Sequence, residues 1–435
     1  MKKNAINKTI QNSTELTTCQ KEAIRLFKSG SNVFLSGEAG TGKSFVLNAF
    51  LSRVKDKNVM VCAPTGIAAL NVGGVTLHRA FSIPCRPLGP KDRPDTVSKE
   101  LLRTDLIVID EISMCRFDVF QYVANSILMA EEQSGRSKQL IVIGDFFQLP
   151  PVITRQDRYV LNQLWGKNTF GDGYAFQSPL WGEFGFRHVI LNEIVRQRDD
   201  IEFLTSLNNL RNGQLSSIDW LNENANAVEN QGIFLCPTNK EVNNINNKAA
   251  DSLDGDYTVF NSKSIGRVTD NDRPTSEILK LKIGMRVMAV KNDSEGRYQN
   301  GSLGTVKRIS KDKSVVCVGF DNGDTADIEM HCWEIDAYKL NEENDKVEAK
   351  PVGWFYQIPL RPAYAITIHK SQGQTFDCAN LNPKCFSNGQ LYVAVSRLKS
   401  ISGLHLTKKI LPSSLKTSKD VLDFYQAGTT QVPTR

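Results

Sequence analysis

Short runs of β-branched and aliphatic residues alternate with longer amphipathic stretches over the first 190 residues of the chain. Such alternation is typical of βαβ units built around a parallel sheet. A stretch rich in proline and charge, Pro84–Pro94, interrupts the pattern and predicts a small surface insertion within about residues 77–100. The apolar runs predict five strands, at Asn32–Ser36, Val59–Ala63, Asp105–Ile109, Gln139–Ile143 and His188–Leu191.

The same alternation resumes with a predicted strand at Ile233–Cys236 and a helix after Thr238, and it returns at Ala363–Thr367. Between about residues 251 and 359 it gives way to short alternating runs with no clear helix. There Val315–Phe320 faces Ile328 across an Asp-Asn-Gly turn, which is a strong hairpin signal. We therefore predict an α/β fold with a first domain at residues 1–190, a second domain at residues 191–250 plus 360–435, and a small β-barrel at residues 251–359 inserted in the second.

Composition and charge narrow the class of protein without defining it. Hydrophobic residues make up 40% of the 435 residues and charged residues 23%, as in globular proteins, and the formal net charge of +6 suits a polyanionic partner. The nine cysteines include no C-x-x-C pair, which argues against a zinc site or a disulfide framework. The opening MKKNAINKTI lacks the apolar run of a secretory signal, and no stretch is apolar enough to span a membrane, so we expect a cytoplasmic bacterial or phage protein.

The strongest chemical signal is GEAGTGKS, Gly37–Ser44, which follows a predicted strand and opens a predicted helix. This is the pattern of a phosphate-binding loop, in which backbone amides cradle phosphates and glycines keep side chains away. Lys43 would reach the outer phosphates, and the Ser44 hydroxyl would bind Mg²⁺. A glycine-rich turn before an ordinary helix is the alternative, which the strand and helix context disfavours. The predicted nucleotide-binding residues of the loop are Gly37, Ala39, Gly40, Thr41, Gly42, Lys43 and Ser44.

Two further apolar strands end in polar residues. LIVIDEIS brings Asp110 and Glu111 to the edge of the sheet, where Asp110 would hold Mg²⁺ and Glu111 would act as the base for the attacking water. Taken alone, such a pair more often marks an ordinary helix start, but a phosphate loop in the same sheet favours the catalytic role. GDFFQLPP places Asp145 and Gln148 at the same edge, where the Gln148 amide would sense the γ-phosphate.

Six more motifs follow one another in a fixed order. They are LTTCQ with Gln20, APTGIAA from Ala63, TLHRAF from Thr76, EIVRQ with Arg196, AITIHKSQGQT from Ala365 and YVAVSR ending at Arg397. With the three motifs above, they make the chain resemble the PIF (petite integration frequency) family of superfamily-one 5′-to-3′ DNA helicases, relatives of RecD and Dda. The resemblance runs from residue 16 to residue 397. It implies two RecA-like domains, with a small insertion in the first and an SH3-like β-barrel inserted in the second.

The resemblance also implies roles at an ATP site. Gln20 would select the adenine, and Gly373 would let the backbone approach the nucleotide closely. Arg196 and Arg397 would reach from the second domain to the γ-phosphate as arginine fingers. The implied catalytic residues are Lys43, Asp110, Glu111, Gln148, Arg196 and Arg397, with ATP and Mg²⁺ as cofactors.

For DNA, the resemblance implies a groove that holds a single strand by its phosphates and sugars without reading its bases. The part assigned to the barrel is less specific, because its NG and SLG sequences are also plain turn chemistry. The implied DNA-binding residues are Pro64, Thr65, Gly66 and His78 in the first domain, Lys291, Asn292 and Asn300 in the barrel, and Thr367, His369 and Lys370 in the second domain.

The activity implied is that of a monomeric motor that moves 5′ to 3′ along single-stranded DNA and unwinds duplex, with forked or G-quadruplex DNA as substrates and replication or repair proteins as partners. GDFFQLPP lacks the aromatic and arginine residues that 3′-to-5′ relatives carry soon after the glutamine, which favours the 5′-to-3′ direction. By analogy alone, Pro84–Pro94 would be the wedge that splits the duplex.

Two readings from other classes stay open on sequence alone. A phosphate-loop ATPase that remodels protein or packages DNA would keep Lys43 and Glu111 but would need no inserted barrel. A non-catalytic nucleic-acid clamp would carry a decayed site, whereas every catalytic residue type is present here. Stimulation of ATP hydrolysis by single-stranded DNA separates the motor from both.

Overall fold

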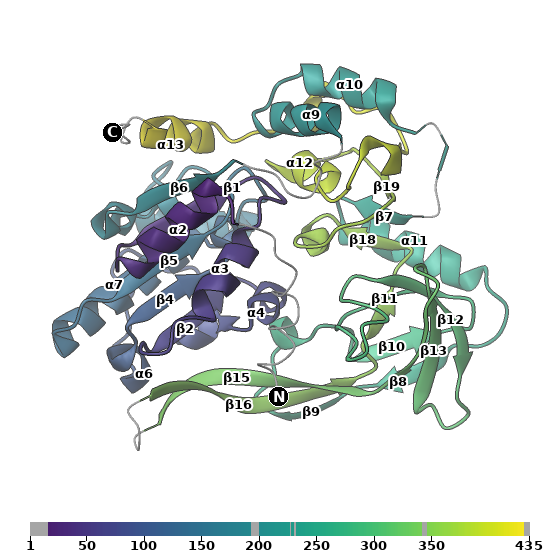
Figure 1. Ribbon diagram of the computed structural model, residues 1–435, viewed down its shortest axis with the longest axis horizontal. Coiled ribbons are helices and arrows are strands. Elements are labelled where there is room, and N and C mark those ends of the chain that lie inside the picture. Colours follow the sequence, from purple (N-terminus) through teal and green to yellow (C-terminus); the bar gives the residue numbers. More distant parts are fainter. Residues whose placement is uncertain (1–15, 193–199, 227, 230–231, 342–345, 430–435) are drawn as a thin grey trace.

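The computed structural model describes residues 16–192, 200–226, 228–229, 232–341 and 346–429. Two α/β domains lie side by side, and a β-rich region lies beneath the second domain (Figure 1). Arg196 lies outside the described residues. Within those residues, no helix has the length and apolar character needed to cross a membrane.

The first domain is built on a six-stranded parallel sheet with strand order β3-β2-β4-β5-β1-β6. Residues of β1, β4 and β5 are buried throughout, as expected for a parallel sheet covered on both faces. All five predicted strands are confirmed with ends within one residue, and only the two-residue β3 was missed. The strands are β1 Val33–Gly37, β2 Val59–Ala63, β3 Val75–Thr76, β4 Leu106–Ile109, β5 Gln139–Ile143 and β6 Arg187–Leu191.

Helices cover both faces of this sheet (Figure 1). On one face, Phe27 and Leu47 pack with Leu35 of β1 in one core. On the other, Phe120 and Ile127 pack with Phe34 in a second core. The helices are α2 Thr18–Lys28, α3 Lys43–Leu51, α4 Gly66–Val72, α5 Leu77–Ala80, α6 Lys99–Arg103, α7 Phe117–Ser134 and α8 Arg155–Trp165, with 3₁₀ turns at Ile112–Met114, Ala175–Gln177 and Pro179–Phe184.

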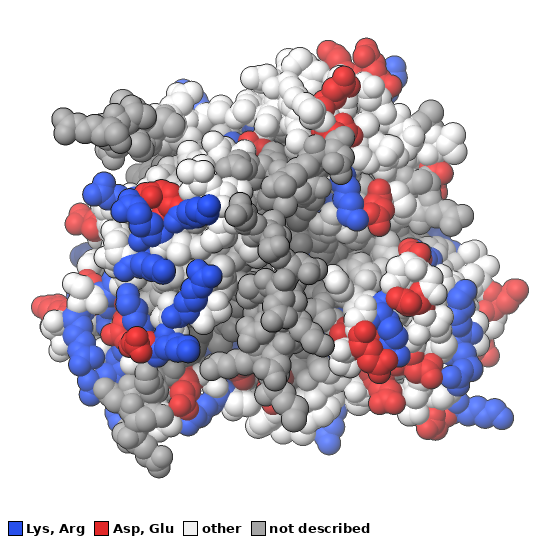
Figure 2. Space-filling view, viewed as in Figure 1, with Lys and Arg blue, Asp and Glu red and all other residues white. Residues whose placement is uncertain are grey.

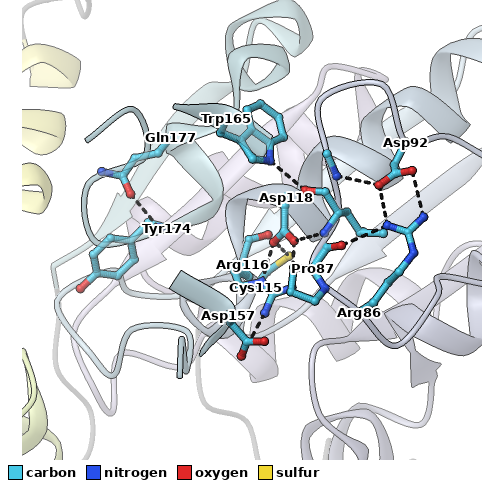
Figure 3. A network of polar contacts seen from close by, with 12 residues as sticks. Arg86, Pro87, Asp92, Cys115, Arg116, Asp118, Asp157, Trp165, Tyr174 and Gln177 are labelled. Atoms are coloured by element: carbon cyan, nitrogen blue, oxygen red, sulfur yellow. Dashed lines mark hydrogen bonds and ion pairs between the residues drawn. The ribbon is translucent and has the colours of Figure 1, made fainter. Parts of the chain in front are cut away.

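The stretch predicted as a surface insertion is anchored to the first domain (Figure 3). Leu88 is fully buried in the core, its backbone N–H donates to the Asp118 carboxylate at 2.9 Å, and its carbonyl accepts from the Trp165 indole at 2.8 Å. A bidentate pair between Arg86 and Asp92 ties the loop to itself. Most of the stretch is exposed, so the surface insertion stays a prediction, and the apolar Leu88 and a buried carboxylate hold its middle against the domain.

The second domain carries a four-stranded parallel sheet with the order β18-β7-β19-β20. Its apolar residues, including Leu235 and Ile366, form a core separate from those of the first domain. The strands are β7 Ile233–Cys236, β18 Ala365–Thr367, β19 Ala379–Leu381 and β20 Leu404–Leu406, and the helices are α9 Ile201–Arg211, α10 Ser216–Asn224, α11 Asn239–Asp251 and α12 Gln390–Val395.

The inserted region contains a five-stranded antiparallel sheet with the order β14-β13-β12-β11-β17. The predicted hairpin is confirmed, because Val316 pairs with Ile328 across the turn. A two-stranded sheet, β8 with β10, shares the same apolar core. The strands are β8 Thr258–Asn261, β10 Ile278–Leu281, β11 Arg286–Ala289, β12 Leu303–Ile309, β13 Val315–Phe320, β14 Thr325–Glu329 and β17 Leu360–Pro362.

One long hairpin departs from the expected barrel. β15 (His331–Asn341) pairs with β16 (Lys346–Gln357), which also pairs with β9 (Lys263–Gly266). This sheet runs beneath the first domain (Figure 1), where Arg79 donates to the Asp336 carbonyl. The assignment of residues 251–359 to a single barrel is therefore corrected. The physical reason is that residues such as Trp333 build a small core of their own.

The last helix, α13 (Lys419–Thr429), packs on the first domain although residues 360–435 were assigned to the second. Phe424 stacks on Phe176 with ring centroids 4.3 Å apart, and Tyr425 accepts from the Phe146 backbone N–H through its hydroxyl at 3.4 Å. The aromatic residues of the helix thus complete the aromatic cluster around Phe146. The chain crosses back over the cleft to place them there.

His188 provides a test of this packing. Its ring stacks on Phe34 at 4.5 Å between centroids, its Nε2 lies 2.7 Å from the Ser36 hydroxyl, and burial lowers its pKa to about 4. An unfolded chain binds this proton near the ordinary pKa of ~6.5. The free energy of unfolding should therefore fall as the pH drops below ~6.5, by up to about 3 kcal/mol near pH ~4.

We expect His188→Phe to keep the ring stack and to lose this part of the acid destabilisation. The measurement is the difference in Tm between neutral and mildly acidic buffer for both proteins. Because other groups titrate equally in the two proteins, the comparison isolates the imidazole. The same acid shift in wild type and variant would contradict the assignment.

Candidate functional site

The loop between β1 and α3 has the backbone that a phosphate cradle requires. Gly40 and Gly42 adopt φ of 88° and 86°, which L side chains rarely do. Lys43 opens α3, and its Nζ donates to the carbonyls of Gly37 at 2.7 Å and Glu38 at 2.9 Å. Burial lowers the pKa of Lys43, which the carboxylates of Asp145, Glu111 and Asp110 oppose. The ammonium group is thus held inside the loop and faces carboxylates.

Gln20 lies directly against this loop. Its Nε2 donates to the Thr41 carbonyl at 3.2 Å, and its Oε1 accepts from the Thr17 backbone N–H at 3.1 Å in a capping box that starts α2. A Cβ at position 42 would come within 2.9 Å of the Gln20 amide nitrogen. Gln20 is therefore fixed beside the phosphate loop by the same contacts that start its helix.

Asp110 and Glu111 follow β4 and lie on the cavity wall with Ser44. Glu111 has φ of 52°, a left-handed conformation that is costly for a residue with a side chain. Burial raises the pKa of both carboxyls, the charge of Glu111 adds to the effect on Asp110, and Lys43 opposes it on both. Two buried, neighbouring carboxylates favour binding of a cation, which would lie between the carboxylates and a phosphate.

A magnesium ion fits this arrangement. In the described part of the chain, no cluster of three or more His, Cys, Asp or Glu side chains could hold a metal by itself. Mg²⁺ commonly takes one or two protein oxygens and completes its shell with phosphates and water. Ser44 and Asp110 supply one hydroxyl and one carboxylate of that kind on the same wall.

Asp145, at the end of β5, pairs with an arginine that the sequence reading missed. Arg211, the last residue of α9 in the second domain, donates to the two Asp145 oxygens at 3.0 and 3.3 Å. The Asp145 side chain is fully buried and the Arg211 guanidinium lies 4.0 Å above the Phe147 ring. Burial lowers the pKa of Arg211, but Asp145 outweighs it, so the group stays charged. No sequence motif around Arg211 predicted this contact.

Helix α12 brings further second-domain residues to the phosphate loop. The backbone N–H of Ala39 donates to the Tyr392 hydroxyl at 3.1 Å. Gly389 packs on Gln148 so closely that a Cβ would lie 2.5 Å from the Gln148 carbonyl oxygen. Tyr392 was also missed as a site residue, although it lies within the YVAVSR motif that ends at Arg397. The predicted Gln148 thus lies where the two domains meet.

Arg397 is buried behind this contact. Its Nε donates to the Val393 carbonyl and its Nη2 to the Ser396 hydroxyl, both at 2.9 Å. Its charge reaches the cleft, because Arg397 is among the groups that lower the pKa of Glu111. The structure therefore places Arg397 within electrostatic reach of the predicted base.

One cavity of about 1390 Å³ joins the carboxylate site to the predicted DNA groove. All three units of the chain contribute to its walls. Of the predicted DNA-binding residues, Pro64, Gly66 and His78 are not part of the lining, and neither are Gln20, Lys43, Gln148 and Arg397 of the ATP site. The predicted residues brought together are Ser44, Thr65, Asp110 and Glu111 from the first domain, Lys291, Asn292 and Asn300 from the inserted region, and Thr367, His369, Lys370 and Gly373 from the second domain.

Hydroxyl and amide side chains fix the backbone of this groove. Thr65 caps α4 by accepting from the Ala68 backbone N–H, and Thr367 accepts from the Lys370 backbone N–H, both at 3.3 Å. The Asn292 side chain accepts from the Asn300 backbone N–H at 2.8 Å. Burial lowers the pKa values of His369 and of Lys370. Such a wall offers donors and modest positive charge in a fixed geometry.

The charge on the outer surface differs in distribution from the charge inside the cavity. Figure 2 shows Lys and Arg side chains gathered over the first domain, whereas they alternate with Asp and Glu over the inserted region. The cavity itself mixes Lys291 and Lys370 with Asp110 and Glu111. The outer charge can attract a polyanion from a distance, but the groove alone has the shape to hold a strand.

A phosphate loop with paired carboxylates at the carboxyl end of a parallel sheet, faced by a second α/β domain, defines an ATP-hydrolysing motor with two RecA-like domains. The model of the PIF1-like helicase family matches residues 15–220. The chain is 31% identical to the ATP-dependent DNA helicase Pif1 of Campylobacter jejuni over 91% of this chain and 94% of that protein. The chain therefore belongs to the PIF1-like helicase family.

Solved structures agree with this membership. The chain aligns with Bacteroides sp Pif1 in complex with ADP-AlF4 at a TM-score of 0.84 and 34% identity, covering 96% of this chain and 98% of that one. Against Pif1 from Bacteroides in complex with ADP-AlF3 and single-stranded DNA, the TM-score is 0.69 at the same identity and coverage. The expected fold of two RecA-like domains is confirmed.

The buried pair of Arg211 and Asp145 generates a test by double-mutant cycle. Arg211→Met leaves the Asp145 carboxylate buried without a cation, which should cost about 3–5 kcal/mol of unfolding free energy. Adding Asp145→Asn removes that charge, so the double variant should be less destabilised than the two single changes added together. Urea denaturation of the four proteins measures the coupling, and additive losses would show that the pair does not join the domains.

Proposed function

We propose that this protein is an ATP-dependent DNA helicase that translocates 5′ to 3′ on single-stranded DNA and unwinds duplex or other structured DNA. The observation that carries the proposal is the shared cavity, which is lined both by Asp110 and Glu111 of the ATP site and by Lys370 of the predicted DNA groove. The relatives named above are ATP-dependent DNA helicases, which supports the same assignment here.

At the ATP site, each group has a role that its position supports. The loop amides from Gly37 to Ser44 and the Lys43 ammonium bind the phosphates, and Gln20 beside the loop reads the adenine edge. Mg²⁺, when bound by Ser44 and Asp110, neutralises charge on the phosphates. Glu111 takes the proton of the attacking water, and its raised pKa suits a base. Gln148 would sense the γ-phosphate, and Gly373 would let the backbone approach the nucleotide. Arg397 would act as an arginine finger from the second domain, and Arg196, by its motif alone, would do the same.

Motion follows from holding one nucleotide between two domains. The phosphate loop is already in contact with α12 through Ala39 and Tyr392, so a γ-phosphate gripped from both sides closes the cleft further, and hydrolysis removes that bridge. The lower TM-score against the DNA complex, at equal identity and coverage, supports a different domain arrangement on DNA. Alternating grip by the two domains then advances the strand.

The strand itself would lie along the cavity wall. Thr65 in the first domain, Lys291, Asn292 and Asn300 in the inserted region, and Thr367, His369 and Lys370 in the second offer hydroxyls, amides and cations to phosphate and sugar. Pro64, Gly66 and His78 flank the first-domain part of this wall in sequence. Contacts of this kind give strong dependence on salt and little dependence on base sequence.

The finer substrates rest on analogy with relatives. A structure of one relative is titled as DNA unwinding at forked double-stranded DNA by two coordinating Pif1 helicases. For this chain we propose forked and G-quadruplex DNA, action as a monomer with replication or repair proteins, and a cytoplasmic location. The anchored loop at Pro84–Pro94 would serve as the wedge, because the buried Leu88 gives it the rigidity that strand separation needs.

Direction is the sharpest test of the proposal. With ATP and Mg²⁺, the protein should displace the strand from a duplex with a 5′ single-stranded tail and leave the matched 3′-tailed duplex largely paired. Strand displacement on the two substrates, which share one duplex sequence, measures this. Unwinding of the 3′-tailed duplex alone would overturn the direction, and unwinding of neither would overturn the helicase assignment.

Lys43→Ala and Glu111→Gln serve as controls for the ATP site. Each removes a group of the hydrolysis machinery, and losses of comparable groups at γ-phosphate sites reach ~10³ to 10⁵ in rate. Both variants should bind single-stranded DNA, because neither residue touches the predicted strand. Wild-type turnover in either variant would place the ATP site elsewhere.

A further inference from the structure

Arg361 lies at the junction between the inserted region and the second domain. It sits in β17, where its partner across the ladder is Met288 of β11, and the chain enters β18 of the second domain at Ala365. Its side chain lines the same cavity as Thr367 and Lys370. No motif used above assigns it a role.

Arg361 is a partly buried cation without a carboxylate partner among the described residues. Its Nη2 donates to the Pro274 carbonyl, while its Nε is buried and has no hydrogen-bond partner. Among the described residues no ion pair to Arg361 is found, and burial is the cause that lowers its pKa, to about 10. At neutral pH the guanidinium is therefore charged, desolvated and uncompensated.

Three other partly buried arginines pair with carboxylates, whereas the buried Arg397 is hydrogen-bonded to the Val393 carbonyl and the Ser396 hydroxyl. Arg79 pairs with Asp272 at 2.7 Å, Arg116 with Asp118 at 2.6 Å, and Arg211 with Asp145 at 3.0 Å. A buried charge without a partner costs folding free energy and is retained where an outside ligand completes it. The contrast with these arginines indicates that the partner of Arg361 is not in the chain.

A second observation points to the same ligand. The side-chain amides of Gln372 and Gln374 line this cavity, and the buried Gln372 Nε2 and Oε1 and Gln374 Oε1 have no hydrogen-bond partner. Burial lowers the pKa of Lys370, and the nearby charge of Arg361 lowers it further, so the two cations lie close together. The cavity wall thus carries two cations and an unpaired amide donor. An anion with several acceptor oxygens would satisfy all three groups.

We propose that Arg361 binds a backbone phosphate of the single-stranded DNA, at the point where the inserted region meets the second domain. The inference rests on the proposed function, since it deepens the DNA groove assigned above. A guanidinium presents paired donors that match phosphate oxygens, so the contact neutralises the buried charge. We assign this phosphate to DNA and not to ATP, because Arg361 lies in β17, where the inserted region joins the second domain, whereas the phosphate loop lies between β1 and α3 of the first domain.

The test compares Arg361→Gln with wild type in binding to fluorescein-labelled oligothymidine and oligodeoxyadenosine by anisotropy across a range of salt. Losing one phosphate contact should weaken both oligonucleotides by the same factor, about tenfold at low salt, and reduce the slope of log affinity against log salt by ~0.7. The KM for ATP without DNA should stay unchanged. Arg361→Lys, which keeps the charge without the fork, should fall between the two proteins.

Arg286→Gln is the matched control. Arg286 lies in the neighbouring strand β11 of the same sheet but pairs with Asp321 and is not part of the cavity lining. Its loss should lower the Tm and leave DNA affinity unchanged. Arg361→Gln should instead keep or raise the Tm of the DNA-free protein, because it removes an unpaired buried charge.

Two outcomes overturn the inference. Wild-type DNA affinity and salt slope in Arg361→Gln would show that no phosphate binds there, and a lower Tm with unchanged affinity would make Arg361 a structural residue like Arg286. In both cases wild type still binds DNA, so the proposed function stands. Failure of wild type itself to bind either oligonucleotide would overturn the proposed function instead.

Discussion

The buried ion pair between Arg211 and Asp145 is the contact on which the arrangement of the two α/β domains depends. Asp145 ends the central strand β5 beside the phosphate loop, and Arg211 ends the second-domain helix α9. A pair so desolvated is costly to separate, because either partner alone would be a buried charge. The aromatic rings of Phe147 and Tyr425, the latter from α13, lie near the guanidinium and exclude water from it. The ion pair thus holds the two domains together beside the phosphate loop.

This constraint explains why the predicted ATP and DNA sites share one cavity. In parallel α/β sheets, ligands bind beyond the carboxyl ends of the strands. Asp110 directly follows β4, Thr367 is the last residue of β18, and both residues line the same space. A change of closure at the carboxylates therefore alters the width of the groove without any long pathway between sites. The inserted region closes the far wall through Lys291 and Asn300.

The sequence predicted what depends on local pattern and missed what depends on tertiary contact. Strands such as Val59–Ala63 were found because a parallel sheet needs a continuous apolar run. The ATP site could be predicted because phosphate chemistry restricts the spacing of its residues. Arg211 was missed because one arginine in a helix has no local sign of a carboxylate 66 residues away in sequence. The hairpin that starts at His331 is not part of the barrel, and α13 packs on the first domain. Both were mispredicted because aromatic side chains pack in contacts that the alternation of apolar and polar residues does not specify. The ion pair and the packing of α13 both depend on contacts between residues far apart in the sequence.

The central claim is that one cavity links the nucleotide to the strand, and reciprocal linkage tests it most directly. The Kd for oligothymidine is measured with and without ADP and aluminium fluoride, and the Kd for that nucleotide complex with and without oligothymidine. A shared cavity predicts that each ligand changes the affinity of the other, by the same factor, since coupling free energy is reciprocal. Affinities that are independent of the second ligand in both directions would contradict the account.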